Sequence, residues 1–182
     1  TSTSSNYTGG LVGLNYVSLN SVTATGNVTG LHQTGGLVGQ NQASINNATA
    51  TGNVTGSNDV GGLAGINYWY AIGQSGALLA TGNVQGYDSV GGLVGRMYGS
   101  SIYNSTAKGW VSGTSSVGGL VGYSYNSSMN SATVSNETSG SYVNGGSTVY
   151  FGVKGTNQVG GFIGYLNDSS SISGSTTNSK VV

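Results

Sequence analysis

Hydrophobic residues recur along this chain at fixed places in a repeated unit, separated by glycine, serine, threonine and asparagine. The clearest part of the unit is Gly-Gly-Leu-Val-Gly or a close variant of it. Its copies begin at Gly9, Gly35, Gly61, Gly91, Gly118 and Gly160. Successive copies therefore start 26, 26, 30, 27 and 42 residues apart. A period in this range is typical of solenoids, in which each repeat stacks on the next.

Aligning the copies places the apolar residues in four columns. The first column is Leu11, Leu37, Leu63, Leu93, Leu120 and Phe162, and the second is Leu19, Ile45, Ile102, Met129 and Ile172. The third is Val28, Val54, Val84, Val111, Val153 and Val181, and the fourth is Val60, Val90, Val117 and Val159. The short β-branched runs between turn residues favour strands, and no helical apolar stripe is present. We therefore predict one all-β domain over residues 1–182, a parallel β-helix (β-solenoid) of about six coils with 26–30 residues per coil.

Glycine, asparagine and two longer segments mark the turns between these strands. We expect the glycines to supply positive φ at sharp turns and to let successive backbones approach closely. The stacked asparagines after Gly26, Gly52 and Gly82 predict an amide ladder that Trp110 interrupts. The third repeat carries extra residues around 69–74. A longer insertion at about 135–149 alternates like a hairpin, and either a tolerated surface loop or a binding element fits it.

The motif resembles a known repeat family. Gly35-Gly-Leu-Val-Gly39, a Ser/Asn-rich stretch and then Ala50-Thr-Gly-Asn-Val54 are similar to the GLUG-motif repeat. That repeat occurs in large bacterial and archaeal surface proteins, including adhesins and the non-catalytic part of some immunoglobulin A–cleaving metallopeptidases. The resemblance implies a β-solenoid in an exported protein and does not specify an activity.

Composition limits the partners. Charged residues are 4% of the chain, against about a quarter in an ordinary domain, and four basic residues balance four acidic ones. No basic patch for nucleic acid and no apolar run long enough to span a membrane is present. The absence of cysteine excludes thiolate metal sites and suits an extracellular location.

Candidate catalytic chemistry is sparse. A zinc peptidase needs two histidines and a glutamate, and His32 is the only histidine. Glycoside hydrolysis needs a carboxylate pair, and only Asp59 and Asp88 are placed to lie one coil apart. Such a pair could hold a weak cation or raise one pKa, and solvated turn aspartates are the alternative. We predict no enzyme activity, no metal site and no cofactor.

A tyrosine column is the main candidate binding surface. Tyr16, Tyr68, Tyr98 and Tyr125 each lie three positions after the last glycine of a motif. If the motif leucine faces the core, strand alternation puts Val12, Leu14 and Tyr16 on one outer face. Self-stacking, contact with another protein and glycan binding are the three interpretations of this column.

Two weaker surface signals remain. Thr23 and Thr25 align with Thr49 and Thr51, a pattern that would suit ice binding if it extended further, but Lys108 interrupts it. Eight Asn-x-Ser/Thr sequons are present, of which Asn27 and Asn53 are the best placed in turns. The sequons are at Asn6, Asn27, Asn47, Asn53, Asn104, Asn126, Asn136 and Asn167.

These observations favour a non-enzymatic extracellular structural protein, either a cell-surface adhesin or stalk segment or a filament subunit. Neither 1–8 nor 171–182 resembles a cap, which fits a fragment of a longer repeat protein or open ends that pair between copies. The expected partners are copies of the chain, end to end or side by side, and surface glycans. A glycan-binding module that uses the Tyr column and the insertion is the alternative, and an ice-binding protein is a further one.

Overall fold

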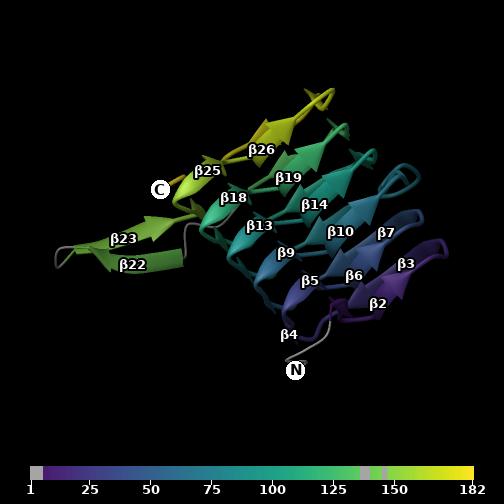
Figure 1. Cartoon of the computed structure of the whole chain (residues 1–182), viewed down its shortest axis with the longest axis horizontal. Coiled ribbons are helices and arrows are strands. Elements are labelled where there is room, and N and C mark those ends of the chain that lie inside the picture. Colours follow the sequence, from purple (N-terminus) through teal and green to yellow (C-terminus); the bar gives the residue numbers. More distant parts are fainter. Residues whose placement is uncertain (1–5, 136–139, 145–146) are drawn as a thin grey trace.

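The computed structural model describes residues 6–135, 140–144 and 147–182, and over these residues the chain forms 28 strands and no helix. The strands follow a coil that repeats along one axis, so each strand pairs in parallel with its counterpart in the next coil (Figure 1). Sheets A and B each contain six strands, one for each coil. The prediction of an all-β parallel solenoid of about six coils is confirmed.

Sheets A and B flank the double glycine, with A before it and B after it. Sheet A consists of β1 (Thr8–Gly9), β5 (His32–Gly35), β9 (Asn58–Gly61), β13 (Asp88–Gly91), β18 (Ser115–Gly118) and β25 (Asn157–Gly160). Sheet B consists of β2 (Val12–Asn15), β6 (Val38–Asn41), β10 (Ala64–Tyr68), β14 (Val94–Tyr98), β19 (Val121–Tyr125) and β26 (Ile163–Asn167). Because Gly35 pairs with Gly61 and Val38 with Ala64, the sequence repeat and the strand register coincide.

Sheets C and D complete each coil. Sheet C consists of β3 (Leu19–Ala24), β7 (Ile45–Ala50), β11 (Leu78–Ala80), β16 (Ser105–Ala107), β21 (Thr133–Val134) and β28 (Thr176–Thr177), with β15 (Ser101–Tyr103), β20 (Ser128–Asn130) and β27 (Ser171–Ser173) in a three-stranded sheet beside it. Sheet D consists of β4 (Val28–Thr29), β8 (Val54–Thr55), β12 (Val84–Gln85), β17 (Val111–Ser112) and β24 (Val153–Lys154). Each of these sheets also pairs in parallel register.

The core consists of two clusters that run along the axis. The larger contains the interior members of the first two columns together with the alanines of sheet C, and the smaller contains the two valine columns. Leu63, Ile45 and Val84 are completely buried. Each such side chain stabilises the fold by about 1.5–3 kcal/mol relative to leaving it in water, so the columns supply the driving force for coiling.

The second hydrophobic residue of the motif is also buried, which corrects the expectation that it lies on an outer face with Leu14 and Tyr16. Leu37 and Val38 belong to the same core cluster. Leu37 lies in the bend before β6, outside the strand. Asn41 is interior as well, three residues after Val38, so strict alternation does not hold in β6. The corner at the double glycine therefore directs both motif hydrophobes inward.

The third repeat contributes a core residue that the alignment missed. Ile72 is completely buried and bridges Ile45 on one side and Ile102 on the other. It fills the second column in the third coil. The extra residues of this repeat lie after Ile72, before Leu78 rejoins the register of sheet C.

The motif glycines allow close approach of successive backbones, as expected, but they do not have positive φ, which corrects that part of the expectation. Residues with positive φ are mostly polar, and in sheet A they form a column of Gln33, Asp59, Ser89, Ser116 and Gln158. A Cβ on Gly65 would lie 2.4 Å from the backbone carbon of Gln33. Side chains that hydrogen-bond locally tolerate the left-handed region, whereas only glycine fits where two backbones touch.

Two asparagine ladders run along the axis. On the surface, the Oδ1 atoms of Asn27, Asn53 and Asn83 each accept a hydrogen bond from the next coil's backbone N–H, and the series ends at the N–H of Trp110. In the interior, the amide of Asn15 donates to Asn41, and that of Asn41 donates to Asn67, at 2.7 and 2.6 Å. The expected ladder therefore exists through side chain–backbone bonds, and a second, buried one joins the first three coils.

The insertion forms a hairpin. Strands β22 (Gly140–Asn144) and β23 (Ser147–Phe151) pair antiparallel and project from the body of the solenoid (Figure 1). Asn136, Glu137 and the glycines at 145 and 146 lie outside the described residues.

Candidate functional site

Three charged residues, Asp59, Asp88 and Arg96, lie together on the outer side of sheets A and B. The polar column with positive φ in sheet A faces a column in sheet B that contains Gln40, Ile66, Arg96, Tyr123 and Tyr165 in register. The left-handed backbone turns the sheet A side chains toward this outer side. We call the trough between these two columns, which crosses successive coils, the A/B groove.

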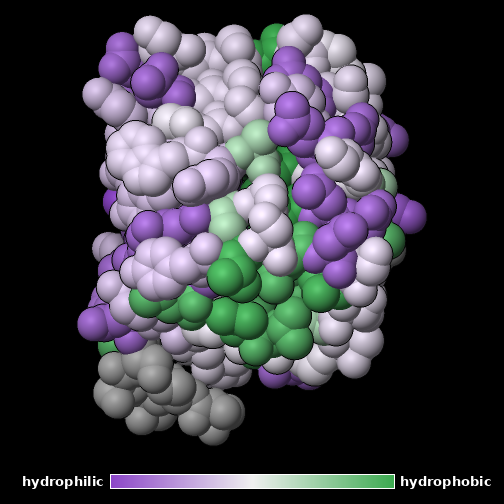
Figure 2. Space-filling model, turned by 90° about the vertical axis from the view of Figure 1, so that its right-hand side faces the viewer, coloured by the Kyte–Doolittle hydropathy of each residue, from purple (hydrophilic) through white to green (hydrophobic). Residues whose placement is uncertain are grey.

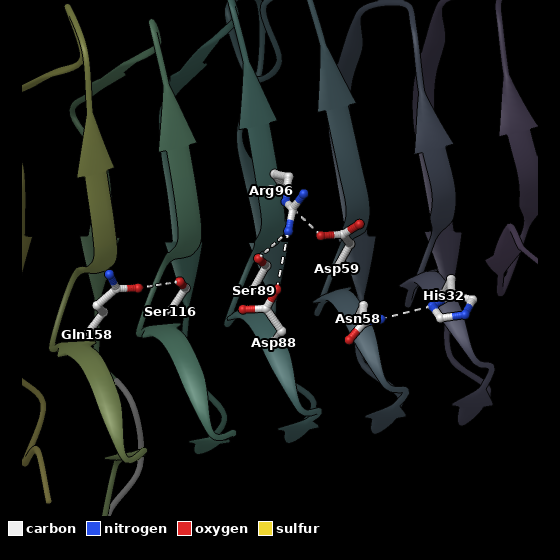
Figure 3. A network of polar contacts seen from close by, with 8 residues as sticks. All are labelled: His32, Asn58, Asp59, Asp88, Ser89, Arg96, Ser116 and Gln158. Atoms are coloured by element: carbon white, nitrogen blue, oxygen red, sulfur yellow. Dashed lines mark hydrogen bonds and ion pairs between the residues drawn. The ribbon is translucent and has the colours of Figure 1, made fainter.

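Arg96 is the centre of the A/B groove (Figure 3). Its Nε lies 2.8 Å from Oδ1 of Asp59 in the previous coil, and its Nη2 lies 3.4 Å from Oδ2 of Asp88 in its own coil. Nη2 also donates a hydrogen bond to the Ser89 hydroxyl at 2.8 Å. Nε and Oδ1 form an ion pair at this distance. The angle between them is unsuitable for a hydrogen bond. One guanidinium therefore joins two coils and two carboxylates.

The two aspartates differ in environment. Asp59 is 8% exposed, so it is not a solvated turn residue, whereas the side chain of Asp88 is 34% exposed. Burial raises the pKa of the Asp59 carboxyl from its ordinary value of 3.8 to about 6, Arg96 opposes this rise, and the charge of Asp88 adds to it. Desolvation thus outweighs the ion pair at this position.

The groove continues to the second coil through His32. The amide Nδ2 of Asn58 lies 3.2 Å from Nδ1 of His32. Because an amide nitrogen only donates, Nδ1 accepts, and the proton of the neutral ring is on Nε2. In the other direction, the Ser116 hydroxyl donates to Oε1 of Gln158 at 2.9 Å. The cavity in the groove has a volume of about 330 Å³ and is lined by Asn6, Tyr7, His32, Gln33, Asn58, Asp59, Asp88 and Arg96.

Aromatic rings border the groove on sheet B. Tyr68 and Tyr98 stack at a centroid distance of 5.4 Å, and Tyr98 meets Tyr125 at 5.8 Å with a tilted ring. Gln42 separates Tyr16 from these three tyrosines in the column, and the Tyr16 side chain is 63% exposed. The structure thus brings three of the four predicted tyrosines together and leaves the fourth apart.

A second aromatic pair lies next to Arg96. Its guanidinium carbon is 5.2 Å from the centroid of the Tyr123 ring, which stacks on Tyr165 at 5.2 Å. Tyr98 contacts Tyr123 at 6.2 Å, so the two groups of rings form one continuous surface. The alignment missed Tyr123 and Tyr165 because the position after the last motif glycine holds different residues in the other repeats, so no tyrosine column is visible there.

The sequons lie on the surface in most cases. Asn6, Asn27, Asn47, Asn53, Asn104 and Asn126 are exposed. Asn167 is half-buried and its amide donates to the Tyr123 hydroxyl at 3.4 Å, and Asn136 lies outside the described residues. Asn47 and Asn104 also use their amide nitrogens in hydrogen bonds, to Asn20 and to the Gly73 carbonyl. The ladder bonds of Asn27 and Asn53 use Oδ1 and not the amide nitrogen.

The threonine columns extend farther than the first two coils. Thr23, Thr49, Thr106, Thr133 and Thr176 occupy one position of sheet C, with Leu79 in the third coil. Leu79 breaks this column and Lys108 the neighbouring one. In the described part of the chain, His and acidic residues nowhere gather in a group of three that could hold a metal ion, and no helix there is long and apolar enough to cross a membrane.

Comparison with known families agrees with the repeat anatomy. The model of the GLUG motif matches residues 30–55 and 86–112. The chain carries GLUG repeats. Each matched stretch spans one coil, from just before a strand of sheet A to the following strand of sheet D, so the GLUG repeat corresponds to one solenoid turn. No curated protein and no solved structure matches the chain.

Arg96 is the functional candidate that sequence reasoning overlooked. It is the only arginine, and it occupies a sheet B position that holds Gln40, Ile66 and Tyr123 in neighbouring coils. Its isolation in a chain with so few charges was the available signal. The pairing partner, Asp59, could not be read from spacing because the two residues belong to different sheets of adjacent coils.

Proposed function

We propose that this chain is a non-enzymatic structural or adhesin-type protein of the cell surface whose coils pair end to end with further coils of the same kind. The observation that carries the proposal is a difference in exposure: the apolar columns are buried in the interior coils and exposed in the terminal ones. The GLUG repeat and the solenoid fold are consistent with it. The two carboxylates of the groove both pair with Arg96, which leaves neither of them poised as a free acid or base.

The terminal coils expose the columns that the interior coils bury. Leu11 is 48% exposed in the first coil, and its counterpart Leu37 is completely buried. In the last coil Ile172 and Val181 are 46% and 41% exposed, and both continue buried columns. Figure 2 shows hydrophobic surface gathered in the lower part of the view, on the side of the first coil. Exposed apolar columns next to unpaired strand edges are the surfaces to which another β-coil binds.

If the last coil of one copy paired with the first coil of another, equivalent strands would pair in the same register as between the coils of one chain. Such a contact joins different surfaces of two copies, so it continues in one direction as a filament. A charge at each end would oppose the contact, because burial of an unpaired charge is costly. The test is a double variant, Leu11→Lys with Ile172→Lys.

The experiment compares assembly of the wild type and this variant by sedimentation velocity over a range of concentrations and by negative-stain microscopy. A matched control, Tyr70→Lys with Tyr87→Lys, adds the same two charges at exposed positions away from the terminal coils. We expect oligomers or fibres for the wild type and the control, and monomers for the end variant. A wild type that stays monomeric at every concentration, or an end variant that assembles as the wild type does, refutes the proposal.

A further inference from the structure

The A/B groove combines concentrated polar chemistry with an open shape. The chain has four acidic and four basic residues, and Asp59, Asp88 and Arg96 all line this cavity of about 330 Å³ together with the single histidine. The other lining residues are Asn6, Tyr7, Gln33 and Asn58, so no aliphatic side chain contributes. The lining is more polar than that of most small-molecule sites, which are largely apolar, so a ligand of this groove would itself be polar.

The charges of the groove restrict the class of ligand. Arg96 occupies the space between Asp59 and Asp88, where a metal cation would otherwise sit. Two carboxylates around one guanidinium also repel an anion, since their summed charge is negative when both are ionised. The polar lining disfavours an apolar ligand. A neutral ligand rich in hydroxyl groups remains, because a hydroxyl both donates and accepts hydrogen bonds.

The groove offers donors and acceptors that the protein does not saturate. The Nε2–H of His32 is a donor, and the half-exposed carboxylate of Asp88 is an acceptor. The other polar lining side chains nearby are Gln33 and Asn58, whose amides carry both donors and acceptors. The His32 N–H and the Asp88 carboxylate are therefore a donor and an acceptor with which the hydroxyl groups of a ligand in the groove can pair.

The aromatic surface adds a second kind of contact at the Arg96 end. Tyr123 and Tyr165 follow Arg96 in register along sheet B, and Tyr98 and Tyr125 lie beside them. Trp69 is 66% exposed, and its ring packs on Gly99, where a Cβ would meet it at 2.8 Å. Flat rings with polar edges suit the apolar faces of sugar rings.

We propose that the A/B groove binds a neutral saccharide chain that lies along the solenoid axis, with hydroxyl groups in the polar part and a sugar ring on the tyrosines beyond Arg96. Coils stack about 4.8 Å apart, so a linear polymer in this direction meets His32, Asp59, Arg96 and Tyr123 in successive coils. This site is on the side of the solenoid and does not depend on end-to-end pairing.

The experiment measures binding of neutral oligosaccharides by the full chain. The probes are tetra- to hexasaccharides of glucose, mannose, galactose and N-acetylglucosamine, with a uronic acid oligomer as the anionic comparison, followed by calorimetry and by NMR titration. The variants are Asp88→Asn, which changes a half-exposed acceptor, and Arg96→Gln, which removes the central donor. Lys108→Gln is the matched control, since it removes one positive charge from an exposed position on sheet C's side.

We expect at least one neutral probe to bind, on the order of tenfold weaker binding for each groove variant, and unchanged binding for Lys108→Gln. Circular dichroism identifies a variant that fails to fold, and Asp88→Asn keeps the test valid if Arg96→Gln does so. Absence of binding to every neutral probe, preference for the uronic acid oligomer, or equal binding by the folded groove variants and the wild type overturns the proposal. We expect the Leu11→Lys, Ile172→Lys variant to bind the same probe as the wild type. Saccharide binding is thereby tested separately from end-to-end assembly.

Discussion

Replacing Asp59 with asparagine tests which force prevails in the A/B groove, burial or ion pairing. Asp59 is 8% exposed and lies 2.8 Å from the Arg96 guanidinium. The substitution keeps the size of the side chain and removes its charge. It therefore mimics the protonated carboxyl at every pH.

The expected magnitude comes from the pKa of this carboxyl. Burial raises the Asp59 pKa from 3.8 to about 6 in the folded chain. The folded state therefore holds the proton more tightly than the unfolded state, and the stability that protonation confers is fully present below pH 3.8 and is lost as the pH rises through 6. A change of one in pKa corresponds to about 1.4 kcal/mol, so the loss is about 3 kcal/mol at pH 7. We expect Asp59→Asn to be more stable than the wild type by up to this amount at pH 7.

The assay is urea unfolding of the wild type and the variant between pH 3.5 and 8, a range that includes both pKa values, 3.8 and about 6. The difference between their free energies of unfolding should be small below pH 4, rise between about 4 and 6, and stay level above 6. Asp168→Asn removes the same charge from an exposed position and should show no such rise in its stability relative to the wild type. An Asp59→Asn protein that is less stable than the wild type at pH 7 would show that the ion pair outweighs burial and would refute the reasoning.

Two further predictions concern the backbone contacts and the buried ladder. Gly65→Ala places a Cβ 2.4 Å from the backbone carbon of Gln33 and should destabilise the chain by several kcal/mol or prevent folding. The Cβ of Gly26→Ala meets nothing within 4 Å, so this variant should be nearly neutral. Thermal unfolding of both variants checks this prediction, and equal effects would contradict it. Asn41→Leu leaves the Asn15 donor and the Asn67 acceptor unpaired and should lower the free energy of unfolding by about 1–3 kcal/mol for each group. Urea unfolding measures this loss, and an unchanged midpoint would show that the ladder does not stabilise the core.

Much of the fold follows from the repeat itself. The aligned columns of leucine and valine predicted parallel stacking, and the observed pairs Val28–Val54 and Gly35–Gly61 are the pairs of that alignment. Identical side chains one period apart lie on the same face only if equivalent strands pair in register, so the period determined the architecture. The prediction was weaker where the period varied: Ile72 was missed because it lies next to the extra residues of the third repeat, which were assigned to a range that included it.

The candidate site was less accessible to the same reasoning. The tyrosine column was visible because Tyr68, Tyr98 and Tyr125 share one position of the repeat. The Arg96–Asp59 pair was not visible, because it joins different sheets of adjacent coils and neither residue recurs at its position in the next coil.

The sequence by itself determined the all-β class, the parallel register and the membership of most of the core, since all three depend on the recurrence of apolar residues. Only the tertiary structure decided which side of each strand faces inward and which polar groups meet. The corner at the double glycine turns both Leu37 and Val38 into the core, and left-handed backbone at Asp59 turns its carboxylate toward Arg96. These directions depend on backbone dihedral angles and on the closure of each coil, neither of which a pattern of hydrophobic and polar positions encodes.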